Sequence, residues 1–98
     1  MSAQEFIKNE DGYIKWIESH PNGFVINTEK SKNPSYMVLH RADCYHISTY
    51  NAMSKPGGFT TRQFIKICAM SKDDLREWVK VNGRQDGSFS SECPNCNP

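Results

Sequence analysis

The sequence predicts an α+β fold with about three antiparallel strands and two flanking helices. Short β-prone runs and two helical patterns follow one another along the 98 residues, without internal repeats or a linker long enough to separate two domains. Residues 84–98 show neither a helical nor a strand periodicity, and they have too few apolar residues to pack by themselves. We therefore expect residues 1–98 to form a single domain in which something other than the core orders the C-terminal segment.

The first helix is expected at about residues 11–19, where Tyr13, Ile14 and Ile17 recur at helical spacing. Pro21 and Gly23 end this helix. Residues 1–10 remain outside this pattern, and part of them is expected to be flexible.

Three runs are expected to form strands. Residues 24–26 and 36–39 are short, β-prone and separated by a polar loop, so we expect them to pair as an antiparallel hairpin. In residues 64–68 aliphatic side chains alternate with others, which is typical of a half-buried strand.

The second helix has the clearest local signal. Ser71 begins a capping-box pattern that ends at Asp74, and three apolar residues at helical spacing follow it, with Trp78 as the central one. We expect a helix at about 72–82 that packs on the three strands and ends at Gly83 as a left-handed C-cap.

Cysteine spacing predicts a metal site. Cys93 and Cys96 form a C-x-x-C pair, which supplies two thiolates to one tetrahedral ion, and His40 and Cys44 form an H-x3-C pair that can supply the other two ligands. Four ligands of this kind form the closed set that structural zinc requires. The fold prediction is thus a small zinc-stapled domain with a C-terminal zinc knuckle.

Other assignments of these residues compete with this set. His46 could replace His40, although H-x3-C is the commoner spacing, and Cys93 with Cys96 could instead be a redox dithiol. Cys68 lies within a predicted strand and is interpreted as a small buried apolar residue. His20 is interpreted as a helix-end residue rather than a ligand.

The order of H-x3-C, a strand, a helix and C-P-x-C-x-P resembles the Ada-type metal-binding fold. That family comprises small zinc modules of DNA-repair proteins, with relatives in nucleases and restriction-type proteins. The similar stretch runs from about residue 38 to 98, with residues 23–27 as an optional extension. The resemblance implies a zinc-held α/β module that approaches DNA.

Two departures change what the resemblance implies. The spacer between Cys44 and Cys93 holds 48 residues, longer than in the repair domain. The repair domain uses four cysteines, of which the first accepts a methyl group from a DNA phosphotriester, and His40 stands at that place here. An imidazole is not that thiolate nucleophile, so methyl transfer is not expected.

Charge is unevenly distributed although the chain has a net charge of +1. Residues 28–72 carry a net charge of +5, and the flanking segments carry −2 each. Cations can contact phosphates while aromatic side chains stack on bases, so this segment favours DNA as the partner. The candidate contacts are Arg41, Tyr45, Lys55, Arg62 and Lys66, and Tyr50 and Phe59 lie among them. Taken singly, Tyr45 and Phe59 are better explained as cover for the core.

No residue pattern indicates an enzyme. Phosphate-binding glycine loops and serine nucleophile motifs are absent from the sequence, and metal coordination uses the histidine that hydrolysis of the His-Asn-His type would need. The alternative function is a zinc-stabilised protein-interaction adaptor of a larger nuclease or restriction-type assembly. We expect a cytoplasmic monomer with no membrane association, because the sequence has no apolar run of about 20 residues and no signal-peptide pattern.

Overall fold

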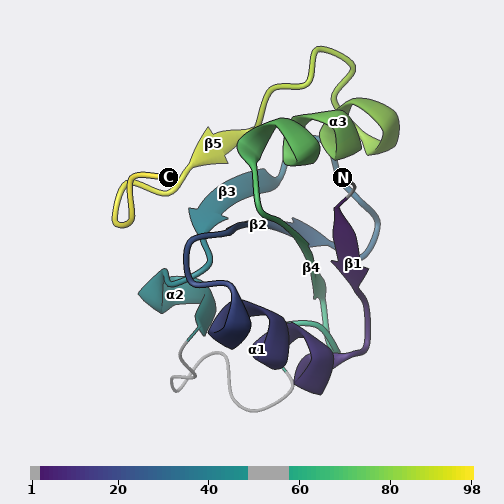
Figure 1. Cartoon of the computed structure of the whole chain (residues 1–98). Helices are drawn as coiled ribbons and strands as arrows, with labels where there is room; N and C mark the ends of the chain where they lie inside the picture. Colours follow the sequence, from purple (N-terminus) through teal and green to yellow (C-terminus); the bar gives the residue numbers. More distant parts are fainter. Residues whose placement is uncertain (1–2, 49–57) are drawn as a thin grey trace.

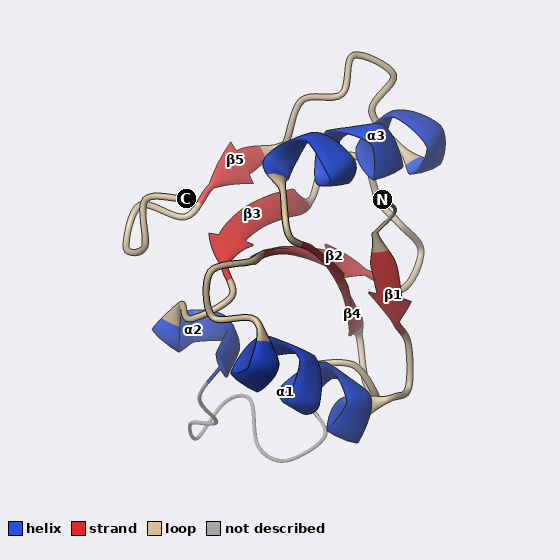
Figure 2. Cartoon of the chain, viewed as in Figure 1, coloured by secondary structure: helices blue, strands red, loops and turns tan. Residues whose placement is uncertain are grey.

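A computed structural model describes residues 3–48 and 58–98. The described chain forms a five-stranded mixed sheet with helices on both faces (Figures 1 and 2). In chain order the elements are β1 (Gln4–Phe6), α1 (Glu10–Ser19), β2 (Phe24–Glu29), β3 (Met37–Arg41), α2 (Tyr45–Ser48), β4 (Phe64–Ala69), α3 (Lys72–Asn82) and β5 (Ser91–Glu92). The strand order is β1-β4-β2-β3-β5. Within these ranges, no helix is long and apolar enough to span a membrane.

The α+β prediction is confirmed, but the number of elements is larger than expected. The predicted hairpin is present, with Ile26 of β2 opposite Leu39 of β3, and β4 pairs with the other side of β2. Two edge strands were missed. β1 pairs antiparallel with β4, within the segment expected to be flexible, and β5 pairs parallel with β3.

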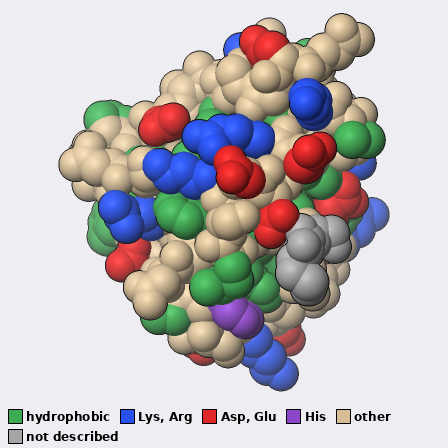
Figure 3. Space-filling model, turned by 45° about the horizontal axis from the view of Figure 1, so that its top comes forward, with side chains coloured by type: hydrophobic (Ala, Val, Ile, Leu, Met, Phe, Trp, Pro, Cys, Tyr) green, Lys and Arg blue, Asp and Glu red, His purple; other side chains and the backbone are tan. Residues whose placement is uncertain are grey.

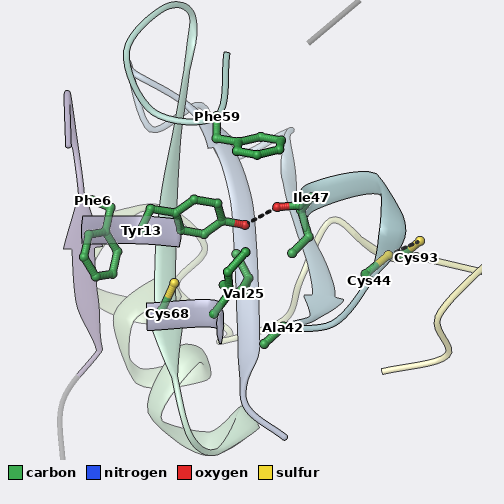
Figure 4. Packing of buried hydrophobic residues seen from close by; sticks show 10 residues of the cluster. Phe6, Tyr13, Val25, Ala42, Cys44, Ile47, Phe59, Cys68 and Cys93 are labelled. Carbon is green, nitrogen blue, oxygen red and sulfur yellow. Dashed lines mark hydrogen bonds between the residues drawn. The ribbon is translucent and has the colours of Figure 1, made fainter. Parts of the chain in front are cut away.

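Each face of the sheet has its own apolar cluster because strand residues alternate between faces. On one face α3 contributes Leu75, Trp78 and Val79, which pack against strand residues that include Ile26, Leu39 and Ile67. On the other face α1 and α2 cover a cluster that contains Tyr13, Val25 and Ile47 (Figure 4). This second cluster extends to Cys44 and Cys93, so core and candidate site are continuous.

The predicted α3 helix is confirmed, with one correction at its end. The Ser71 hydroxyl accepts a hydrogen bond from the Asp74 N–H at 3.2 Å, as the capping pattern indicates. Gly83 ends the helix, but its φ of −164° is extended and not left-handed. A Cβ there would lie 2.4 Å from Met37 Cε, so any larger residue would force the end of the buried Met37 side chain to shift.

The structure places Lys66 in the interior, which corrects the prediction that its side chain contacts DNA. Its side chain is 3% exposed, and Nζ donates hydrogen bonds of 2.8 Å to Asn27 Oδ1 and to the Phe59 carbonyl oxygen. The rings of Tyr13, Phe59 and Phe64 lie about 6 Å from the ammonium group. Lys66 is thus part of the interior.

We expect Lys66 to titrate near pH 8. Burial lowers its pKa from 10.5 to about 8, although Glu10 and then Cys68 oppose the shift. The penalty for the buried charge is fully present below pH 8 and disappears as pH rises toward 10.5, so Lys66 raises the free energy of unfolding over that range by about 3 kcal/mol. An NMR titration of the lysine side chains, with Lys66→Met for assignment, measures this pKa. A midpoint near 10.5 would contradict the expectation.

Candidate metal centre

His40 and Cys44 are positioned by the end of β3 and the turn that follows it. The Ala42 N–H donates a hydrogen bond to the Gly23 carbonyl oxygen at 2.9 Å. Within the turn, the Cys44 N–H donates to the Arg41 carbonyl oxygen at 3.0 Å. The short helix α2 then begins, and the Cys44 carbonyl oxygen accepts from the Ser48 hydroxyl at 2.7 Å. This turn therefore fixes an imidazole and a thiol four residues apart.

Cys93 and Cys96 reach the same place through the parallel pairing of β5 with β3. The pairing sets Glu92 opposite Leu39, and the ladder continues as the Cys93 N–H donates to the Leu39 carbonyl oxygen at 2.9 Å. The chain then turns back, and the Asn97 N–H donates to the Cys93 carbonyl oxygen at 3.2 Å. We call residues 93–97 the C-terminal hook.

The ligand atoms of His40, Cys44, Cys93 and Cys96 lie within 4.8 Å of one another, so the group could hold a metal ion. Cys44 Sγ and Cys93 Sγ are 3.9 Å apart (Figure 4), close to the separation of about 3.8 Å that tetrahedral Zn–S bonds of 2.3 Å require. All four cysteines of the chain are free thiols. Three of the four candidate ligands are buried, and Cys96 is partly exposed.

Burial changes the proton affinities of these groups. Burial, with smaller effects from Lys66 and His46, lowers the pKa of His40 to about 4, so the imidazole is neutral at pH 7 as a metal ligand must be. Its Nδ1 is buried and makes no hydrogen bond within the described part of the chain. Such an unpartnered nitrogen fits a ligand for a metal ion, because buried polar atoms otherwise find a partner.

The two buried thiols, Cys44 and Cys93, differ in pKa. Burial raises the pKa of Cys44 to about 12. Burial also raises the pKa of Cys93, but hydrogen bonds from the backbone N–H groups of Asn95 and Cys96, and the neighbouring thiols of Cys96 and Cys44, lower it below its ordinary value. The turn of the hook therefore stabilises negative charge on Cys93, which suits a thiolate ligand.

Arg41 holds the C-terminal hook by hydrogen bonds. This role was not part of the prediction that Arg41 contacts DNA. Its backbone N–H donates to Cys96 Sγ at 3.3 Å. Its guanidinium group donates to the Cys96 carbonyl oxygen at 2.8 Å and to the Asn97 carbonyl oxygen at 3.1 Å. No sequence signal indicates this contact, because Arg41 and Cys96 are 55 positions apart and only the fold brings them together.

Arg41→Ala is expected to weaken metal binding by up to roughly 10-fold, the lower end of the effect of lost outer contacts, because the backbone N–H that donates to Cys96 Sγ is kept. The expected cause is loss of the guanidinium contacts that hold the Cys96 turn. Competition with a chromophoric chelator measures the affinity. Arg84→Ala is the matched control, since Arg84 donates to the Pro34 carbonyl oxygen at 2.7 Å away from the site. Equal affinities of Arg41→Ala and the wild type would contradict this role.

The remaining sequence candidates lie outside the ligand group. Exposed His46 has its Nε2 2.8 Å from Asn95 Nδ2. Cys68 is buried in the strand cluster and His20 stacks on the Trp16 ring at the end of α1, both as expected. The core interpretation is confirmed for Phe59 but is wrong for Tyr45, which is 61% exposed.

The predicted DNA contacts differ in exposure. Arg41, Tyr45 and Arg62 are exposed, although Arg41 is also hydrogen-bonded to the hook, whereas Lys66 is buried. Lys55 and Tyr50 lie outside the described residues. On the face in Figure 3, where the α3 side is brought forward, basic side chains lie next to acidic ones.

Comparison with known proteins gives no relative. No family model, curated protein or solved structure matches the chain.

Proposed function

We propose that the chain is a zinc-binding module in which Zn²⁺ holds the C-terminal hook to β3 and α2. One observation carries the proposal: a histidine and three cysteines from two distant parts of the chain converge within 4.8 Å. Three sulfurs and one nitrogen in tetrahedral reach are the ligands that structural zinc prefers. With four protein ligands, no coordination position is left for a reacting water, so the ion supplies stability rather than catalysis.

Metal content tests this proposal. Protein purified without chelator is expected to carry one Zn²⁺ per chain in native mass spectrometry, and Co²⁺ substitution is expected to give the absorption bands of tetrahedral thiolate coordination. A native mass equal to that of the bare chain, with no Zn²⁺ taken up on titration, would overturn the proposal.

The resemblance to the Ada-type fold supports DNA as a partner of this module. Within the proposal, Arg41, Tyr45 and Arg62 are the exposed contacts among the described residues, and Tyr45 and Arg41 border one hollow beside the C-terminal hook. A neutral, buried His40 in the first ligand position does not accept a methyl group as a thiolate does, so the proposed role is binding alone. The adaptor function has no comparable residues in its favour.

Salt dependence tests the DNA proposal. Arg62→Ala is expected to lower the log–log salt slope of duplex binding by about one unit, the effect of one lost phosphate contact. Fluorescence anisotropy measures the slope. Arg76→Ala is the matched control, since Arg76 lies on α3 and pairs with Asp73 at 2.6 Å. No binding to duplex or single strands at low salt would overturn the DNA proposal and favour an adaptor.

A further inference from the structure

A second hollow lies on the sheet face that α1 and α2 cover only in part. It is an open hollow of about 310 Å³, at the lower end of the volumes of small-molecule sites. Tyr36 just before β3 and Val38 on it point to this face, because the alternate residues Met37 and Leu39 are buried on the α3 side. The outer rim is formed by Ser91 of β5 and by Asn95 of the C-terminal hook. We call this hollow the β3 hollow.

Hydrogen-bonding groups in the β3 hollow are held in fixed orientations. Lys66 Nζ donates to Asn27 Oδ1 at 2.8 Å, which directs the amide nitrogen of Asn27 toward Tyr36. Asn27 Nδ2 donates to the Tyr36 hydroxyl at 3.3 Å, so that hydroxyl keeps its own hydrogen to donate. The buried Lys66 thus orients donors in a hollow that it does not itself line.

Two flat rings line the hollow. The Tyr36 ring is 37% exposed and rests against Phe64, with ring centroids 5.8 Å apart. The His46 ring is held by Asn95 at 2.8 Å. The inner side of the hollow is formed by His40 and Cys93 of the candidate metal centre, so the hollow adjoins that centre. The exposed Tyr36 ring and the donors of Asn27 and Tyr36 favour a flat ligand with hydrogen-bond acceptors on its edge.

We propose that the β3 hollow binds one unpaired nucleobase, an inference that deepens the proposed DNA binding. A base offers a flat face to the Tyr36 ring and carbonyl or ring-nitrogen acceptors to the donors of Asn27 and Tyr36. A stacked base within a duplex cannot enter a hollow of this kind without leaving the helix. Free nucleosides and single strands are the two sources of this chemistry.

NMR of the ¹⁵N-labelled, metal-loaded protein tests the proposal with thymidine, a short thymidine single strand, a strand of the same backbone without bases, and a duplex. We expect thymidine and the thymidine strand to shift the amide signals of Tyr36, Val38 and Ser91, and the strand without bases to leave them unchanged. Shifts with thymidine alone identify a nucleoside as the ligand and uphold the proposal. Signals of α3 serve as the internal reference.

Tyr36→Leu is expected to weaken binding of the thymidine strand roughly tenfold, the size of one lost ring–base stack. Tyr36→Phe keeps the ring and is expected to have a smaller effect. Far-UV circular dichroism and zinc content verify that both variants fold. If duplex, single strand and base-free strand bind equally and Tyr36→Leu binds as the wild type does, the nucleobase proposal falls while DNA binding stands. If thymidine and every strand leave the spectrum unchanged, both fall.

Discussion

Cys93→Ser is expected to abolish metal binding and to leave the chain unfolded at 25 °C. Cys93 is 6% exposed and belongs both to the ligand group and to the cluster beneath α1 and α2. A structural zinc ion contributes about 10–16 kcal/mol in small zinc domains, whereas an entire domain is stable by only about 5–15 kcal/mol. Because a serine hydroxyl is a poor ligand for Zn²⁺, the substitution removes most of that contribution.

Circular dichroism and zinc analysis on the purified variant measure both effects. Cys68→Ala is the matched control, since Cys68 is also buried but lies outside the ligand group. It is expected to retain the metal and to lose only about 1 kcal/mol of stability. A folded Cys93→Ser protein with one Zn²⁺ per chain would refute the assignment.

Tyr13→Ala is expected to lower the free energy of unfolding by about 3–5 kcal/mol, as truncation of a buried aromatic residue does. Tyr13 is fully buried between the rings of Phe6 and Phe59, which it contacts edge to face. Its hydroxyl donates to the Ile47 carbonyl oxygen at 2.5 Å (Figure 4), which ties α1 to α2. Because α2 follows Cys44 directly, we also expect weaker metal binding.

Urea denaturation measures the stability change and chelator competition the metal affinity. Tyr13→Phe separates packing from hydrogen bonding, because it keeps the ring and removes the hydroxyl that donates to the Ile47 carbonyl oxygen. We expect it to cost about 1–3 kcal/mol. A Tyr13→Ala variant as stable as Tyr13→Phe would show that the ring contributes little.

Local signals made part of the fold predictable. The α3 helix is specified within its own residues by the Ser71 cap and the apolar spacing that follows. The strands β1 and β5 have three and two residues, too few for a pattern, and they exist only because β4 and β3 offer partners. Such pairing depends on register across the whole sheet and leaves no mark in the sequence.

Lys66 shows why alternation in a strand was misleading. In β4 the aliphatic side chains Ile65 and Ile67 face α3, which predicts an exposed opposite face. Helix α1 covers that face, so Lys66 is enclosed with Cys68. The convergence of the four candidate ligands was predictable because ligand chemistry depends on residue type and short spacing. The role of Arg41 was not, since it required the path of the C-terminal hook.

The shortness of β5 has a consequence for dynamics. With two residues at the edge of the sheet, β5 has few backbone bonds to protect it, so the segment from Ser90 to the C-terminal hook is expected to be the first unit to open. Release of the proposed zinc ion would require the same opening, because Cys93 and Cys96 lie in that segment. Hydrogen–deuterium exchange at the Cys93 amide, whose N–H is bonded to Leu39, therefore measures the opening through which that ion would leave.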